Sequence, residues 1–169
     1  KRLDAEIAQL DDGRRFNVML LDLDRFKAVN DGLGHASGDA LLASFAKRLL
    51  LLVGKDDMVA RFGGDEFAIL QIVRKDALRE ASLLCTSVID AAALPFLLAG
   101  KEAIVGTSIV VSTAPVHGHD VSELLKDADV ALYCAKSEGR GRFRFFEHGM
   151  EMSRDHDNEI QHDLDKALR

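Results

Sequence analysis

Short apolar runs alternate with polar and glycine-rich stretches along the chain, and several of these apolar runs predict β-strands. The run at 17–24 has an uninterrupted apolar core from Val18 to Leu21, which is typical of a central strand covered on both faces. Other strand-like runs lie at 57–62, 66–73 and 102–113, and a shorter strand is predicted within 139–147. The first run is therefore expected near the centre of a sheet.

Helical spacing of apolar residues between these runs predicts the helices. Helices are predicted at 40–53, where the signal is strong, and at 76–93 and 120–137. Segment 26–39 is rich in Gly, Asn and Asp and predicts a short helix followed by a loop. Further helices are predicted at the start of the chain and in the polar segment 151–169.

The order of the predicted elements indicates the fold class. Strand, helix, hairpin, helix, strand, helix and short strand follow one another, which is the βαββαβ pattern of an α+β fold with a ferredoxin-like, palm-type sheet. We expect the helices to pack on one face of this sheet, with the remaining elements at its edges.

Composition is typical of a soluble globular domain. The chain has 169 residues, of which 47% are hydrophobic and 30% charged, enough for one domain with a full core. The net charge of -6 argues against a nucleic-acid partner, because phosphate backbones bind basic surfaces. No run of 18 apolar residues is present, so no membrane contact is expected. Cys85 and Cys134 lie in helix-like runs and are expected to be reduced thiols of a cytoplasmic domain.

A glycine pair joins two of the predicted strands in a tight turn. Gly63 and Gly64 can both adopt positive φ without strain, as a two-residue hairpin loop requires. In that register Arg61 faces Glu66 and can form a cross-strand ion pair. Asp65 then lies at the turn beside backbone without side chains, where a large ligand can approach. The alternative is a plain hairpin whose acidic residues only contact solvent.

Two aspartates end the first predicted strand. Asp22 and Asp24 are two residues apart, so on a strand they project to the same side. If the glycine hairpin lies beside this strand, Asp22 and Asp65 converge. Oxygen ligands around an open site suit Mg²⁺, which keeps water and substrate phosphates as its other ligands and supports phosphoryl chemistry. The alternative for Asp24 is an N-terminal cap of the following short helix.

Three separate motifs resemble the GGDEF family of diguanylate cyclases. They are RFGGDEF at 61–67, DLDRFKAVNDGLGHASGDALL at 22–42 and ADVALYCAKSEGRGRF at 128–143. The similarity extends from residue 16 to residue 147 and implies a palm-type fold related to class III nucleotide cyclases. It also implies an enzyme that uses Mg²⁺ or Mn²⁺ to condense two GTP into cyclic di-GMP and two pyrophosphates, working as a homodimer.

The resemblance also implies roles for residues of these motifs. Asp22 and Asp65 would bind the metal together with the backbone carbonyl of Leu23. Asp65 or Glu66 would help to deprotonate the ribose 3′-hydroxyl. The residues implied at the guanine are Asn30, His35 and Asp39. The residues implied at the phosphates are Arg25, Phe26 and Lys27, through backbone amides, and Lys136 and Arg140, through charge.

Two positions depart from the family pattern. Val110 stands where the family usually has glycine. The family's product-inhibition motif, Arg-x-x-Asp, would have its arginine at Gly54 and its aspartate at Asp57. Because glycine cannot form the paired hydrogen bonds of a guanidinium, we predict that this product-inhibition site is absent.

The same resemblance divides the chain into a GGDEF domain at 1–148 and a linker-like helix at 149–169. The apolar positions of that helix resemble the connection to a phosphodiesterase domain of the EAL type, so sensor and EAL-type neighbours are expected in the full-length signalling protein. A second interpretation is a GTP-binding regulatory module without turnover that controls such a phosphodiesterase domain. A third is a protein-interaction scaffold, which predicts no GTP binding.

Overall fold

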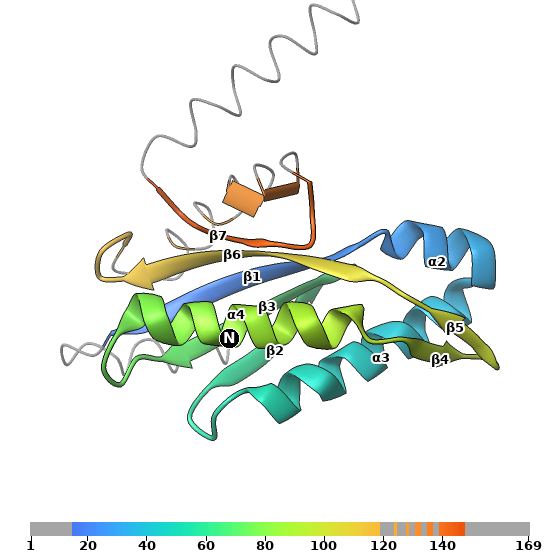
Figure 1. Cartoon of the computed structure of the whole chain (residues 1–169), viewed down its shortest axis with the longest axis horizontal. Coiled ribbons are helices and arrows are strands. Elements are labelled where there is room, and N and C mark those ends of the chain that lie inside the picture. Colours follow the sequence, from blue (N-terminus) through green and yellow to red (C-terminus); the bar gives the residue numbers. More distant parts are fainter. Residues whose placement is uncertain are drawn as a thin grey trace, which may run out of the picture.

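The computed structural model describes residues 15–118 and 139–147, and between them positions 124, 128, 131, 132, 135 and 136. The elements follow one another as β1 (Phe16–Asp24), α2 (Phe26–Leu33), α3 (His35–Leu52), β2 (Met58–Gly63), β3 (Glu66–Ile72), α4 (Ala77–Ala93), β4 (Phe96–Leu98), β5 (Lys101–Ala103), β6 (Gly106–Ala114) and β7 (Phe143–Phe145). Helices and a mixed sheet thus form the predicted α+β fold (Figure 1).

The main sheet is built around β1, as the apolar run predicted. Its strand order is β2-β3-β1-β6-β7, so β1 lies in the middle. Strands β3 and β6 pair with β1 in antiparallel orientation, and β7 runs parallel to β6. Every residue of β1 is buried, which explains why its stretch from Val18 to Leu21 is apolar without alternation.

Both faces of the sheet are covered. Met19, Leu21 and Leu23 of β1 belong to the main core, which α3 and α4 complete on one side of the sheet (Figure 1). Leu20 points to the opposite face and packs in a second cluster whose other members are Val110, Ala128, Ala131, Leu132, Ala135 and Phe146. The expectation that helices pack on one face only is therefore wrong. The family-pattern departure at Val110 lies in this second cluster.

The helix predicted from residue 40 begins earlier, at His35, and only Gly34 separates it from α2. Ser37 and Gly38 donate their backbone N–H groups to the Gly34 carbonyl and so continue the helix. Gly38 is required there by close packing, because a Cβ atom at this position would lie 1.9 Å from Oδ1 of Asn30. The glycine that suggested a loop instead allows α2 and α3 to approach each other.

The glycine hairpin has a different register from the predicted one. Gly63 pairs with Glu66 and Arg61 pairs with Phe67, and a register shift lies between Arg61 and Gly63. The turn residues are therefore Gly64 and Asp65, and the predicted pairing of Arg61 with Glu66 is wrong. The guanidinium of Arg61 instead donates two hydrogen bonds to the carbonyl of Gly64, at 3.0 and 2.7 Å.

Two further boundaries differ from the predictions. The strand predicted at 102–113 is divided into β5, which pairs with β4 in a separate hairpin, and β6. Within 120–137, the six described positions are helical. The predicted helices at the start of the chain and at 151–169, the boundary at 148 and Cys134 lie outside the described residues.

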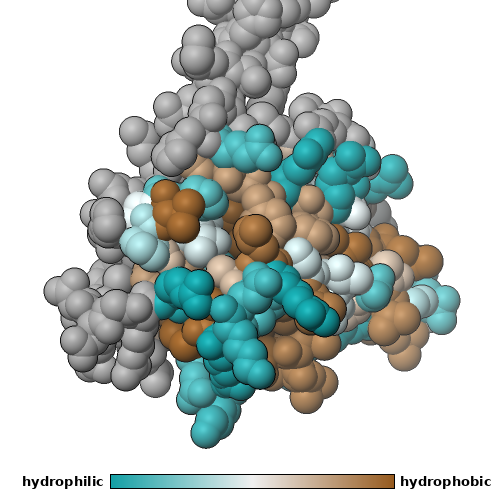
Figure 2. Space-filling model, turned by 60° about the vertical axis from the view of Figure 1, so that its left-hand side comes forward, coloured by the Kyte–Doolittle hydropathy of each residue, from teal (hydrophilic) through white to brown (hydrophobic). Residues whose placement is uncertain are grey.

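Apolar and polar side chains are intermixed on the surface face drawn in Figure 2. Single exposed leucines, such as Leu51 and Leu97, are normal on folded proteins. None of the helices in the described part of the chain has the length and hydropathy needed to cross a membrane. Cys85 is buried against Met19, and this burial raises the pKa of its thiol to about 12.

Candidate functional site

The carboxyl end of β1 carries two buried carboxylates. Asp22 pairs across the sheet with Glu66 of β3 on one side and Ser108 of β6 on the other. Asp22 and Asp24 are 7% and 6% exposed, although both are charged side chains at the end of a strand. Because side chains alternate along a strand, both share the face of Leu20, opposite α3 and α4. The spacing of the two aspartates predicted this arrangement.

The hairpin turn brings a third carboxylate to the same place. The backbone N–H of Leu23 donates to the carbonyl of Asp65 at 3.3 Å, which ties the turn to the end of β1. Asp65 lies close enough for its charge to raise the pKa of Asp22. The prediction from the sequence that Asp22 and Asp65 converge therefore agrees with the geometry.

Lys136 supplies the opposite charge. Its Nζ atom lies 2.7 Å from Oδ2 of Asp22. Burial is the largest influence on Asp22 and raises its pKa above the ordinary value, while the hydrogen bond and charge of Lys136 act in the opposite direction. The net shift is upward because burial and the neighbouring carboxylates outweigh the ammonium group.

Asp24 has a different role from the predicted helix cap. Arg25 occupies the N-cap position of α2, with φ 64°, and no side chain caps the helix there. The Oδ1 atom of Asp24 accepts a hydrogen bond from Oγ of Ser108 at 2.9 Å. Its Oδ2 atom accepts from the backbone N–H of Gly141 at 3.0 Å. The capping alternative is therefore wrong.

The donor chemistry of this edge fits a divalent cation that arrives with a substrate. Among the residues that the structure describes, no group of three or more His, Cys, Asp and Glu side chains is arranged to hold a metal by itself. Asp22 and Asp65 nevertheless supply hard oxygen donors, which suit Mg²⁺ when water and phosphate oxygens complete its shell. Both oxygens of Asp24 accept hydrogen bonds from the protein.

The residues expected at guanine gather around the junction of α2 and α3. Asn30 packs against Gly38, while His35 and Asp39 are exposed on the first turns of α3. Asp39 lines a cavity of 330 Å³ between α3 and the β2–β3 hairpin. The remaining lining residues are Leu42, Ala43, Ala46, Leu50, Val59, Arg61 and Phe67. The described cavity therefore includes Asp39 but neither Asn30 nor His35.

Sequence reasoning missed Arg61 and Phe67 as lining residues of this cavity. The two residues are cross-strand partners in the hairpin, and Phe67 also contacts Phe45 of α3 edge to face, with ring centroids 5.2 Å apart. The signal was present in the RFGGDEF segment, but using it requires the correct hairpin register.

The expected phosphate-binding residues lie at two places. Arg25, Phe26 and Lys27 open α2, where the first backbone N–H groups of a helix have no partner within the helix and favour anions. Lys136 contacts Asp22 in the group of Asp22, Asp24 and Asp65, which we call the acidic edge. Arg140 is exposed on the loop that Asp24 contacts. The structure therefore places cations and helix N–H groups around the end of β1.

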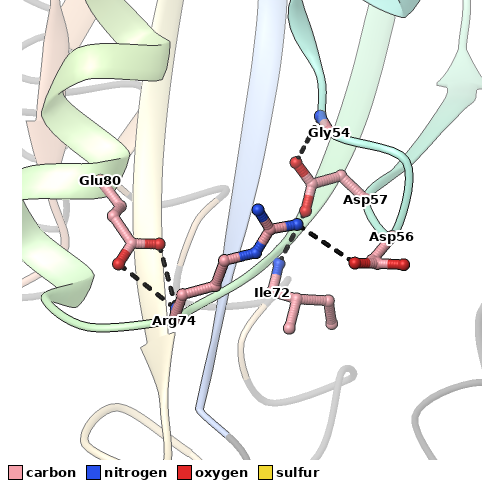
Figure 3. Close-up of polar contacts among 6 residues, drawn as sticks. All are labelled: Gly54, Asp56, Asp57, Ile72, Arg74 and Glu80. Carbon is pink, nitrogen blue, oxygen red and sulfur yellow. Dashed lines mark hydrogen bonds and ion pairs between the residues drawn. The ribbon is translucent and has the colours of Figure 1, made fainter.

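The position of the expected product-inhibition motif is a separate site (Figure 3). Asp57 accepts backbone hydrogen bonds from Gly54 at 2.8 Å and from Ile72 at 2.9 Å, so both its oxygens stabilise the β2–β3 region. Arg74 forms an ion pair with Asp56 at 3.1 Å. A cavity of 340 Å³ adjoins Gly54, Asp57, Arg74 and Glu80, among other residues.

These features define an α+β domain of palm type with an acidic strand end beside a glycine hairpin. The chain belongs to the GGDEF family: residues 1–142 match the family described as "Diguanylate cyclase, GGDEF domain". This confirms the resemblance that the three sequence motifs carry.

Relatives in Pseudomonas aeruginosa include both cyclases and phosphodiesterases. The bifunctional diguanylate cyclase/cyclic di-GMP phosphodiesterase MucR is 39% identical over 168 residues, covering 99% of this chain and 24% of MucR. The cyclic di-GMP phosphodiesterase NbdA is 37% identical over 157 residues, covering 93% of this chain and 20% of NbdA. The chain thus spans a quarter or less of these two relatives.

A solved structure supports the fold directly. The GGDEF domain of TpbB, also called YfiN, from Pseudomonas aeruginosa superimposes with a TM-score of 0.84 at 33% identity, covering 91% of this chain and 90% of that domain. The sequence of the diguanylate cyclase TpbB is 41% identical over 135 residues, covering 77% of this chain and 30% of TpbB. The predicted α+β fold of this family is therefore confirmed.

Proposed function

We propose that this chain is a diguanylate cyclase domain, which condenses two GTP into cyclic di-GMP and two pyrophosphates. The observation that carries the proposal is the acidic edge, where Asp22 and Asp65 lie close together beside the GGDEF hairpin. Lys136 forms an ion pair with Asp22 there. Membership of the family and its diguanylate cyclase relatives support the same chemistry.

The family generally uses divalent metal ions, and here Asp22, Asp65 and the carbonyl of Leu23 would hold Mg²⁺ or Mn²⁺. Such an ion, when bound, would stabilise the negative charge that develops on the phosphates during displacement of pyrophosphate. The buried position of Asp22 strengthens its attraction for a cation, because solvent screens the charge poorly there. Asp65 or Glu66 would accept the proton of the ribose 3′-hydroxyl.

The protein's own groups would orient the nucleotide. Asp39 lines the cavity beside α3, and its carboxylate can accept from both N1–H and N2–H of guanine. Asn30 and His35 would complete this end of the nucleotide site. Lys136, Arg140 and the first N–H groups of α2 would bind the β- and γ-phosphates.

A homodimer would complete the reaction. Cyclic di-GMP is two-fold symmetric, and the residues assigned here would bind one GTP in each domain. Two domains facing each other across a two-fold axis would present each 3′-hydroxyl to the α-phosphate of the opposite GTP.

The test is incubation of the chain with GTP and Mg²⁺, followed by chromatography of the products. We expect the unmodified protein to form cyclic di-GMP. The rate of product formation by Asp65→Ala should be lower by at least about 100-fold. Asp90→Ala, an exposed acidic position on α4, is the matched control and should retain the rate. Absence of any cyclic dinucleotide at high protein concentration would overturn the proposal.

A second candidate is a GTP-binding regulatory module that controls a neighbouring phosphodiesterase domain without turnover. The observation in its favour is the similarity to NbdA, a cyclic di-GMP phosphodiesterase of which this chain spans one fifth. GTP binding measured by calorimetry, without product formation, would favour this candidate over the cyclase.

A further inference from the structure

Asp24 connects three segments that are far apart in sequence. It is the last residue of β1. One of its carboxylate oxygens accepts a hydrogen bond from the hydroxyl of Ser108 in β6, and the other accepts one from the backbone N–H of Gly141 in the 139–142 loop. The residue is 6% exposed; its hydrogen bond from Ser108 is buried, and the one from Gly141 is partly buried. Gly106 lies opposite in the sheet, and a Cβ atom there would lie 2.9 Å from Oδ2 of Asp24. The absence of a side chain at Gly106 therefore leaves room for this carboxylate.

The 139–142 loop needs such an anchor. Arg140 has φ 54°, in the left-handed region that residues with a side chain rarely adopt. Gly139 and Gly141 beside it also have positive φ. The loop is held at Gly141 by Asp24 and at Arg142, whose carbonyl accepts from the N–H of Ile109 at 2.9 Å. Asp24 thus supplies one of the contacts that hold this strained conformation.

The anchored loop is connected to both cations near the acidic edge. Arg140 is part of the loop, and the carbonyl of Lys136 accepts a hydrogen bond from Gly139 at 3.4 Å. Lys136 in turn contacts Asp22, two residues before Asp24. The end of β1 therefore contacts Lys136 through one aspartate and fixes the loop of Arg140 through the other.

We propose that Asp24 is a positioning residue for the triphosphate: it holds the 139–142 loop so that Lys136 and Arg140 face the β- and γ-phosphates of GTP. This role rests on the proposed function. It differs from metal ligation, because both carboxylate oxygens of Asp24 accept hydrogen bonds from the protein. It also differs from general support of the fold, because it acts on the phosphate end of the nucleotide alone.

The experiment compares binding of 3′-deoxy-GTP, which lacks the reacting hydroxyl, with binding of GMP by calorimetry in the presence of Mg²⁺. Asp24→Ala should bind 3′-deoxy-GTP about tenfold more weakly, with GMP affinity changed by less than about twofold. Asp24→Asn should retain most of the affinity, because its amide oxygen can accept from Gly141 while its N–H donates to Ser108. Gly106→Ala should reproduce Asp24→Ala by displacing the carboxylate, and Asp90→Ala should resemble the unmodified protein.

Equal weakening of both nucleotides by Asp24→Ala and by Gly106→Ala would overturn the positioning role, and so would an Asp24→Asn defect as large as that of Asp24→Ala. Hydrogen exchange at the Gly141 amide tests the anchor without nucleotide: it should be faster in Asp24→Ala, and an unchanged rate would contradict the anchor. If the unmodified protein binds neither nucleotide, the proposed function and the phosphate role both fail, while the exchange rate still decides the anchor.

Discussion

Asp22 is the residue at which the demands of the site and of the fold oppose each other. It is buried at the end of the central strand, and Asp65 and Asp24 add negative charge around it. The ammonium of Lys136 compensates only part of this, so the pKa of Asp22 remains raised. An acid with a raised pKa binds its proton more tightly in the folded state, so the ionised form lowers stability.

Asp22→Asn should therefore raise the melting temperature at pH 7 while abolishing product formation. The stabilisation that protonation of Asp22 provides is present at low pH and is lost as the pH rises through its raised pKa. The difference between Asp22→Asn and the unmodified protein should consequently shrink as the pH is lowered towards the acid range. Thermal melts across this range provide the measurement, and a lower melting temperature for Asp22→Asn at pH 7 would contradict the argument.

Asp39 gives a prediction about base specificity. Its carboxylate lines the cavity beside α3, and guanine offers two N–H donors on one edge where adenine does not. Asp39→Ala should lower the preference for GTP over ATP by about tenfold in competition binding, because the lost bonds are specific to guanine. Asp31→Ala, at an exposed acidic position on α2, is the matched control. An unchanged preference would remove Asp39 from the base site.

At the scale of elements, the β2–β3 region depends on Asp57. Its two oxygens accept from the backbone of Gly54, at the start of the loop, and of Ile72, at the end of β3. Asp57→Ala should lower the free energy of unfolding by about 2 kcal/mol, since two hydrogen bonds to a charged group are lost. Urea denaturation measures this, with Asp56→Ala as the control. Equal stability of the two variants would show that these bonds contribute little.

The same region predicts how the domain responds to its proposed product. Asp57 is engaged with the backbone, Gly54 has no side chain, and Arg74 is paired with Asp56. Cyclic di-GMP, which carries two negative charges, should therefore not inhibit turnover through this cavity at low micromolar concentration. The measurement is titration of the product into the GTP assay. Tight inhibition that disappears in Arg74→Ala would show that Arg74 replaces the missing arginine.

The sequence predicted elements whose signal is local and missed those decided by distant contacts. The apolar run of β1 and the spacing of Asp22 and Asp24 were sufficient to place two carboxylates on one face at the end of a strand. The start of α3 was missed because the reason for Gly38 is its contact with Asn30 of another helix. The hairpin register was missed because a bulge leaves no mark in residue spacing. The role of Asp24 depends on Gly141, which lies 117 residues away.

At the scale of the whole molecule, the proposed reaction requires two copies of this domain. The rate of product formation should rise more steeply than linearly with protein concentration in the dilute range, because the active species is a dimer. Initial rates over a dilution series, paired with the oligomeric state at each concentration, provide the measurement. A strictly linear dependence in a sample shown to be monomeric would contradict the two-domain reaction.

The long sequence separations at the acidic edge have a consequence for the order of folding. A growing chain synthesised up to residue 118 already contains β1, β3 and β6, and with them all three carboxylates. The countercharge of Lys136 and the Gly141 partner of Asp24 are synthesised later, and closing a loop of such length is slow compared with forming a helix or hairpin. We therefore expect the carboxylates to rely on solvent until Lys136 and the 139–142 loop dock, so that the phosphate end of the nucleotide site forms later than the central strands.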